Sequence, residues 1–157
     1  METSKSILIN SLFFSLILLG FGHQTYSQAG MSNENSVAVN IIDGDLEWGD
    51  CPELIPNGCN VTIIHGDPSK PNADAVFKFQ PGTDIPEHWH NSAERMILVQ
   101  GEMTVSYEDE ATKTLKAGYY AYGPSKKPHT AKCTGSEPCL LFVGFEKPVD
   151  AFAGKPE

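Results

Sequence analysis

The chain has few positive charges, and its only adjacent basic pair is Lys126 and Lys127. Lysine and arginine together number 11, against 20 aspartates and glutamates, so the formal net charge is −9. A protein with this balance repels phosphate backbones, and one basic pair is too small a patch to hold nucleic acid. The sequence also lacks an internal repeat and a helix-period apolar stripe suited to a membrane surface. We therefore expect no nucleic-acid partner.

No apolar run reaches the roughly 18 residues that a membrane-spanning helix needs. The run at Ile7–Leu19 is broken by three polar residues and follows a lysine, and residues 25–27 offer a site for signal peptidase. A membrane anchor is the alternative interpretation, and the shortness of the run argues against it. We expect residues 1–27 to be a cleaved signal peptide and residues 28–36 to be a disordered lead-in. The protein would then be exported, periplasmic or secreted, with no stable membrane insertion after cleavage.

Cysteines are scarce, and none precedes Cys51, which argues against a lipoprotein. In an exported protein four cysteines are most simply two disulfides, although four cysteines allow three connectivities. Local pairing is favoured, because Cys51 and Cys59 bracket a turn-rich stretch and Cys133 and Cys139 bracket what resembles a hairpin loop. A structural zinc site is the alternative, but no pair has the gap of about two to four residues found in zinc knuckles.

Short apolar runs separated by turn residues predict one all-β domain over residues 37–157. With 14 glycines and 11 prolines in the chain, this pattern favours a sandwich or barrel over a helical or parallel α/β domain. Gly101 stands where a tight turn would join the runs on either side of it into one hairpin. The runs expected as strands are 37–42, 61–64, 75–79, 95–99, 103–107, 119–122 and 140–145.

Three histidines and one glutamate have the separations expected of ligands for a single divalent ion. His88 and His90 share one face of an extended strand, because successive side chains alternate. Residues 91–93 can turn the chain back to bring Glu94 to the same centre, and His129 must arrive on a separate strand. The interior of a β-barrel supplies such convergence. This donor set suits Fe, Mn, Ni, Co, Cu or Zn and does not select among these divalent transition metals.

The same residues fall into two motifs that resemble those of the cupin superfamily. The resemblance spans residues 82–133. Every fixed position of the first cupin motif is filled, by Gly82, His88, His90, Glu94 and Gly101.

The second cupin motif is filled at Gly118, Pro124 and His129. It departs from the family pattern at two positions, where Lys126 replaces a glycine and Cys133 replaces an asparagine. The first departure affects the turn before His129 and not the ligand itself. The resemblance implies a cupin-type double-stranded β-helix, that is, a jelly-roll barrel in a single domain. It also implies a metal site, a small-molecule ligand or substrate, and a homodimer.

Strand parity suggests which residues form the pocket wall. If Glu94 faces inward, Met96 faces inward as well. We place Met96, Tyr107 and Tyr122 at the pocket wall, with ordinary barrel packing as the alternative for each. An apolar and aromatic wall with one metal would suit a small organic anion. His65, in a turn sequence outside both motifs, is interpreted as structural.

Three functional hypotheses remain open. The favoured one is an exported, metal-dependent cupin enzyme that acts on a small enol, keto or aromatic acid, with oxygenase-type chemistry preferred over isomerase or lyase chemistry on a sugar-like substrate. The second is a metal-containing binding or sensing module without turnover. The third is a cupin barrel with an empty site. The metal content separates the third hypothesis from the other two.

Overall fold

Strands form all the regular structure in the part of the chain that this computed structural model describes, residues 35–42, 44–55 and 57–157. None of these residues belongs to a helix long and apolar enough to cross a membrane. The expected signal peptide, residues 1–27, and nearly all of the expected lead-in, residues 28–36, lie outside the described residues.

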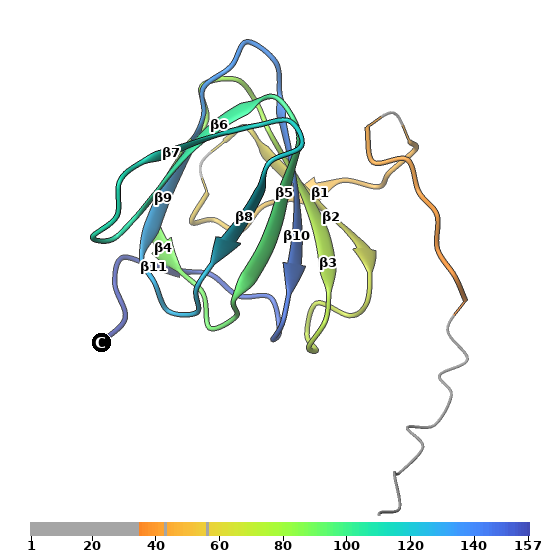
Figure 1. Cartoon of the computed structure of the whole chain (residues 1–157). Coiled ribbons are helices and arrows are strands. Elements are labelled where there is room, and N and C mark those ends of the chain that lie inside the picture. Colours follow the sequence, from red (N-terminus) through yellow and green to blue (C-terminus); the bar gives the residue numbers. More distant parts are fainter. Residues whose placement is uncertain (1–34, 43, 56) are drawn as a thin grey trace, which may run out of the picture. The chain divides into compact units, whose positions relative to one another are not determined.

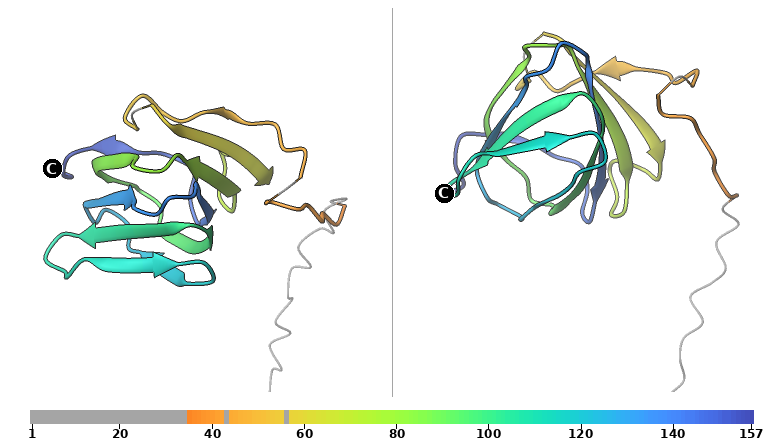
Figure 2. Two further views of the ribbon diagram at one scale, coloured as in Figure 1. Left: turned by 90° about the horizontal axis from the view of Figure 1, so that it is seen from above. Right: turned by 45° about the horizontal axis from the view of Figure 1, so that its top comes forward.

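The strands pair into two antiparallel sheets that wrap around one interior within the unit Ser36–Glu157 (Figure 1, Figure 2). The six-stranded sheet contains, in spatial order, β1 (Gly49–Asp50), β2 (Cys59–His65), β3 (Asp74–Phe79), β10 (Cys139–Phe145), β5 (Glu94–Gln100) and β8 (Tyr120–Gly123). The five-stranded sheet contains β11 (Phe152–Ala153), β4 (Asp84–Trp89), β9 (His129–Cys133), β6 (Glu102–Tyr107) and β7 (Lys113–Lys116). The chain crosses repeatedly between the sheets, which is the predicted all-β jelly-roll architecture.

Alternate residues of the strands fill the interior. In β5, Glu94, Met96 and Leu98 are buried, while Arg95 and Ile97 face outward, as strand parity predicted. The strand β6 shows the same period, with every second side chain buried. Burial of a side chain such as that of Leu98, which is 0% exposed, contributes about 1.5–3 kcal/mol. The polar members of this inward set are therefore held among tightly packed apolar neighbours.

The predicted hairpin around Gly101 is wrong, because β5 and β6 belong to different sheets. β5 pairs with β10 and β8, whereas β6 pairs with β7 and β9. Gly101 has a φ of 86°, and a Cβ atom there would lie 2.8 Å from the carbonyl oxygen of Pro138. This glycine therefore permits a corner that carries the chain from one sheet to the other.

Both disulfides join cysteines that are close in sequence, as predicted. The Cys51–Cys59 bond closes the connection between β1 and β2, and the Cys133–Cys139 bond closes the connection between β9 and β10. The second connection is not the predicted hairpin loop, because β9 and β10 lie in different sheets. Loops this short give disulfides a stabilisation on the order of 2–3 kcal/mol each in the chain-entropy picture.

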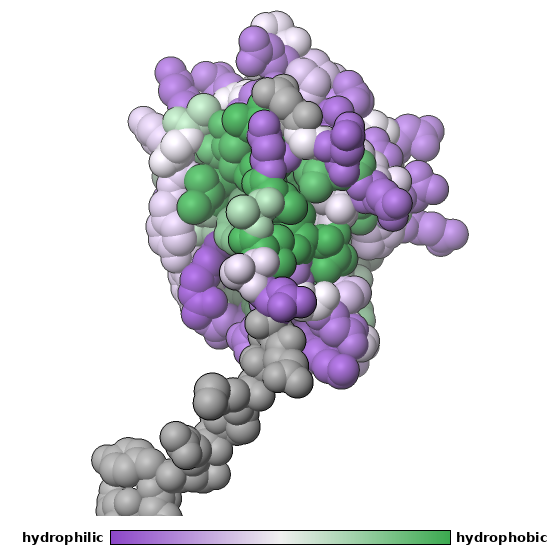
Figure 3. Space-filling view, turned by 90° about the vertical axis from the view of Figure 1, so that its right-hand side faces the viewer, coloured by the Kyte–Doolittle hydropathy of each residue, from purple (hydrophilic) through white to green (hydrophobic). Residues whose placement is uncertain are grey.

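Residues 37–42 do not form the predicted strand. Asn40 interrupts them, since its Oδ1 accepts the backbone N–H of Ile42 at 3.0 Å and its carbonyl accepts that of Gly44 at 3.0 Å. Local hydrogen bonds of this kind compete with strand pairing. The valines of this segment stay about half exposed. Apolar residues also show at the surface on the side of the domain that carries β2 and β3 (Figure 3).

Candidate metal centre

Three histidines from the five-stranded sheet meet inside the barrel. His88 lies on β4, His90 follows the end of that strand, and His129 begins β9 as the direct cross-strand partner of His88. Their candidate ligand atoms all lie within 4.8 Å of one another, and all three side chains are buried. Trp89 points to the opposite face, where its ring stacks on Phe152 at 4.6 Å. Because side chains alternate along an extended chain, His88 and His90 share the inner face and Trp89 between them lies on the other face.

Each histidine of this cluster gives its Nδ1–H to a backbone carbonyl. Because a carbonyl oxygen can only accept, Nδ1 carries the proton and Nε2 keeps a free lone pair. Fixing the tautomer in this way is typical of histidines that bind metals. The acceptors are the carbonyls of Pro86 for His88 at 2.8 Å, of Lys127 for His129 at 3.0 Å, and of Asp150 for His90.

Glu94, the first residue of β5, brings a carboxylate to the histidines. Its Oε1 lies 3.4 Å from Nε2 of His90, and its Oε2 lies 3.8 Å from Nε2 of His129. These nitrogens and oxygens are all electron-pair donors, so in an ionised site they repel one another unless a cation lies between them. The donor set therefore fits a divalent cation, with the three histidines as the core and the glutamate beside them.

The C-terminal segment holds the turn at residues 91–93 that brings the carboxylate back. The carboxylate of Asp150 accepts the backbone N–H of Asn91 at 2.9 Å and its side-chain N–H at 2.8 Å. The Oγ of Ser92 accepts the backbone N–H of Glu146 at 2.8 Å. The sequence motifs contain nothing that points to Asp150, because it is far from the histidines along the chain. Sequence reasoning therefore missed a residue that packs directly against the site.

Burial shifts the pKa values of His88, His129 and Glu94. Loss of hydration, with a smaller effect of the neighbouring histidines, lowers the pKa of His88 to about 4 and that of His129 to about 3. Both rings are therefore neutral at pH 7, in the form that binds a metal ion. Burial also raises the pKa of Glu94, while nearby His90 opposes the rise. In the absence of a cation this carboxyl group holds a proton more readily than an exposed glutamate does.

A cavity of about 140 Å³ adjoins the cluster. No lysine or arginine is among the described residues that line it, and its only carboxylates belong to Glu94 and Asp150. The rest of the wall is mainly apolar and comes from both sheets. It includes Phe77, Phe79, Ile85, Val105, Leu141 and Phe145.

Two of the three residues predicted for the pocket wall line this cavity, namely Met96 and Tyr107. The prediction is wrong for Tyr122, which is 51% exposed and pairs with Arg95 on the outer side of the six-stranded sheet. Side chains alternate along β8, and it is Ala121 that packs against the core. The run of aromatic residues in this strand gave no sign of which of them would face inward.

Comparisons with known proteins give one family. Residues 75–145 match the family model Cupin_2, described as a cupin domain. No curated protein sequence matches the chain significantly. Among solved structures, an oxalate decarboxylase–formate complex from Lactobacillus farciminis is 24% identical, with a TM-score of 0.57 over 69% of this chain and 33% of that chain.

Two further solved structures resemble the fold at lower identity. The DMSP lyase DddQ from Ruegeria pomeroyi is 20% identical, with a TM-score of 0.60 over 71% of this chain and 62% of that chain. The polyketide cyclase RemF from Streptomyces resistomycificus is 14% identical, with a TM-score of 0.64 over 78% of this chain and 88% of that chain. This chain thus spans less than two thirds of the decarboxylase and lyase chains. From its domain match and its two-sheet barrel, we identify the chain as a member of the cupin superfamily.

Proposed function

We propose that this cupin is an exported, metal-dependent enzyme that acts on a small organic acid. The metal ligands would be His88, His90, Glu94 and His129. The observation that carries the proposal is the meeting of three buried imidazoles, each hydrogen-bonded through Nδ1 to a backbone carbonyl, and a carboxylate beside an apolar cavity. Strongly perturbed groups lining a cavity are typical of functional sites.

The cavity wall favours a substrate with a single negative charge and an apolar body. Three neutral imidazoles, one carboxylate and a divalent ion give a site charge of +1, which attracts one carboxylate or enolate. The described residues of the wall offer no lysine or arginine to a second carboxylate, and Asp150 would repel it. A sugar would leave most of its hydroxyl groups unpaired against the apolar wall, at a cost for each. We therefore favour a monobasic enol, keto or aromatic acid.

The protein itself holds the imidazole rings in place and excludes water from the cavity. The backbone carbonyls fix the three rings, and the apolar wall keeps water away from the reacting molecule. When bound, a divalent ion would supply Lewis acidity for a carbonyl or enolate, and a redox-active ion would also support reaction with dioxygen. We favour oxygenase-type chemistry, with Fe, Mn, Ni, Co, Cu and Zn all compatible with these donors.

Two alternatives keep specific support. A lyase or isomerase activity is compatible with the fold, since solved structures of similar fold include a DMSP lyase. A binding or sensing module without turnover is also compatible, because the same cavity would retain a ligand whether or not a reaction follows. Oxygen uptake and product formation separate these alternatives from the proposed oxygenase.

Export has its own support. Both disulfides lie in the described part of the chain, and disulfides persist in oxidising compartments. We propose that residues 1–27 direct the chain to the periplasm or the medium and are removed there. N-terminal sequencing of the exported protein should then begin at Gln28.

The proposed activity is tested with purified full chain reconstituted with each candidate metal. Oxygen consumption and product masses are recorded with monobasic keto, enol and aromatic acids, and with a dicarboxylate and a sugar acid for comparison. The proposal expects turnover of a monobasic acid that is lost in His88→Ala. His65→Ala is the matched control, because His65 is exposed and lies 4.0 Å from Asp74, outside the cluster. Metal-loaded protein that binds a monobasic acid but never converts it would favour the binding module.

A further inference from the structure

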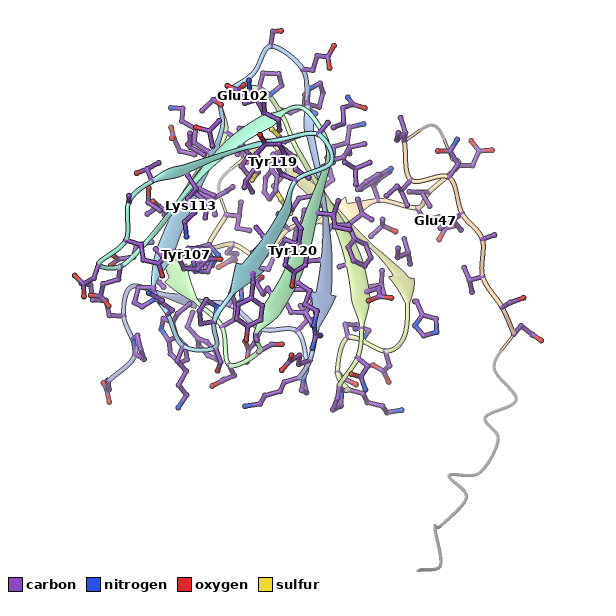
Figure 4. The ribbon with its side chains drawn as sticks, viewed as in Figure 1. Glu47, Glu102, Tyr107, Lys113, Tyr119 and Tyr120 are labelled. Carbon is purple, nitrogen blue, oxygen red and sulfur yellow. A yellow bond between two sulfur atoms is a disulfide. The ribbon has the colours of Figure 1, made fainter. Side chains whose placement is uncertain are left out.

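The hydroxyl group of Tyr107 is a buried polar atom without a partner. Among the described residues, its Oη is the buried side-chain oxygen or nitrogen for which no hydrogen bond is found. The side chain is 6% exposed and lies on the inner side of the barrel, whereas Tyr120 of β8 is 61% exposed (Figure 4). Leaving a hydroxyl group unpaired in such surroundings costs free energy. We therefore expect this group to have a hydrogen-bond acceptor in the functional state.

The surroundings of this hydroxyl group place it beside the carboxylate of the metal centre. The ring of Tyr107 packs on the ring of His129, with centroids 4.8 Å apart. A Cβ atom built on Gly123 would lie 2.5 Å from the hydroxyl oxygen and 3.1 Å from Oε2 of Glu94. Both oxygens therefore converge on the small space that the missing side chain of Gly123 leaves free. The charge of Glu94 also contributes to a raised pKa of Tyr107, after burial as the main cause.

Metal binding would change which hydrogen-bond partners are available to the carboxylate of Glu94. Without a cation, the oxygens of Glu94 lie 3.4 Å from Nε2 of His90 and 3.8 Å from Nε2 of His129. Once those nitrogens bind a cation, their lone pairs can no longer accept a hydrogen bond from a protonated Glu94. The oxygen of Glu94 that does not bind the ion would then be a buried negative charge that requires a hydrogen-bond donor. A phenolic O–H is such a donor and remains protonated at neutral pH.

We propose that Tyr107 is a positioning residue, whose hydroxyl group donates a hydrogen bond to Glu94 in the metal-loaded protein, and that Gly123 is bare because any side chain would displace this pair. The inference rests on the proposed role of Glu94 as a ligand. Hydrogen bonds from outside the ligand set typically orient ligating carboxylates, and their loss costs about 10–100-fold in metal affinity. Tyr107 thus acts on the metal through Glu94 and need not touch a substrate.

The first test measures the cobalt(II) affinity of the full chain by competition with a chelator, in Tyr107→Phe and in the control Tyr120→Phe. Phenylalanine keeps the ring contact with His129 and removes only the hydroxyl group. We expect the affinity of Tyr107→Phe to fall about tenfold or more, and that of Tyr120→Phe to stay within about twofold of wild type. The metal-free Tyr107→Phe protein should be as stable as the metal-free wild type or more stable, because an unpaired buried hydroxyl group is gone.

The outcomes are separable. If wild-type protein binds no cobalt(II), the proposed metal-dependent function fails together with this inference. If the wild type binds the ion and Tyr107→Phe binds it equally well, only this inference is overturned. If Tyr107→Phe weakens binding only in proportion to a loss of stability of the metal-free protein, the residue has a general packing role and the inference is also overturned.

A double-mutant cycle tests the convergence on Gly123. The methyl group of Gly123→Ala would press on the hydroxyl group of Tyr107, so this variant should also lose at least about tenfold in cobalt(II) affinity. In the double variant with Tyr107→Phe part of the crowding is relieved, so the combined loss should be clearly smaller than the product of the two single losses. Independent, multiplicative effects would overturn the proposed pairing.

Discussion

Each histidine of the cluster divides its two ring nitrogens between the backbone and the cavity. The Nδ1–H of His88 and the Nδ1–H of His129 are donated to carbonyls within their own strands or turns, two residues away in sequence. Burial then favours the neutral ring, because a charged imidazolium would lose its hydration. The tautomer and the charge of these rings are thus fixed by each residue's own surroundings, without a metal ion.

The stability of the metal-free protein should fall as the pH drops from about 6.5 towards 4. In this range a histidine of the unfolded chain, whose pKa has the ordinary value of 6.5, binds a proton. Folded His88 and His129 stay unprotonated, because their pKa values are about 4 and 3. The unfolded state therefore holds more protons, and each histidine costs up to about 1.4 kcal/mol of unfolding free energy per pH unit. The raised pKa of Glu94 acts in the opposite direction. Urea denaturation at pH 6.5 and 5.0 measures the effect.

Two variants show whether these histidines are the cause. His129→Gln should have a shallower pH dependence than wild type, and His65→Gln should keep that of wild type. A metal-free protein that is equally stable at both pH values would contradict the assignment of neutral, buried rings.

Lys126 shows how a departure from the second cupin motif is accommodated. Its φ is 61°, in the left-handed region that glycine adopts without strain, and its backbone N–H donates to the carbonyl of His90 at 2.7 Å. The turn expected with glycine thus forms with lysine, at a conformational cost on the order of 1 kcal/mol. The strain is accepted where the loop before His129 meets the end of β4.

Replacing this lysine with glycine should stabilise the fold relative to alanine. Both Lys126→Gly and Lys126→Ala remove the long side chain, but only glycine relaxes the positive φ. We expect Lys126→Gly to exceed Lys126→Ala by about 0.5–1 kcal/mol in the free energy of unfolding, measured by urea denaturation. An alanine variant at least as stable as the glycine variant would show that the backbone here is unstrained.

At the scale of elements, the site depends on where three strands begin and end. His129 and Glu94 are the first residues of β9 and β5, and His90 follows the last residue of β4. A side chain at a strand end is positioned by the strand on one side and by a turn on the other, so the turns matter as much as the strands. The turn after β4 is fixed by Asp150, and the contact of β11 with β4 holds this C-terminal segment in place.

Removing the carboxylate of Asp150 should therefore weaken metal binding from outside the ligand set. Asp150→Ala deletes the acceptor of two hydrogen bonds from Asn91 and loosens the segment whose carbonyl receives the Nδ1–H of His90. We expect a fall of about tenfold in cobalt(II) affinity. Asp84→Ala is the control, because Asp84 is exposed and pairs with Lys132 at 3.0 Å. Equal affinities in the two variants would show that the C-terminal segment does not orient the site.

Strand positions could be predicted from the sequence where one face is apolar and the other polar. Residues 103–107 alternate in this way, and β6 is found there. The strand β7 was missed, because among its four residues only Leu115 is buried. The segment 37–42 was wrongly predicted, because the hydrogen bond made by Asn40 outweighs an apolar composition. Pairing between strands was not predictable, since the corner at Gly101 depends on contacts with residues distant in sequence.

The histidine cluster was more predictable than the pocket. Spacing alone placed His88 and His90 on one face, and the second motif identified His129. The identity of the wall residues depends on strand parity relative to neighbouring strands, which is why Tyr122 was misplaced. Gly123 and Asp150 carry no local pattern that indicates their neighbours. Their roles follow only from packing in three dimensions.

The jelly roll as a whole brings the parts of the site together from two sheets. Its strands alternate between two sheets, so His129 of β9 and His90, just after β4, face Glu94 of β5 in the other sheet across a shared interior. The same interior leaves the cavity beside them. The homodimer expected from the sequence stays a prediction, which light scattering of the purified full chain would check.

We propose that His88, His90, Glu94 and His129 together hold one metal ion in the native protein. Native mass spectrometry with elemental analysis, on protein recovered from its own exported compartment, measures this directly. The expected result is close to one transition-metal ion per chain in wild type, and loss of the ion in His129→Ala but not in His65→Ala. Wild-type chains that carry no transition metal, or a His129→Ala variant that keeps the ion, would show that these side chains do not form a metal site.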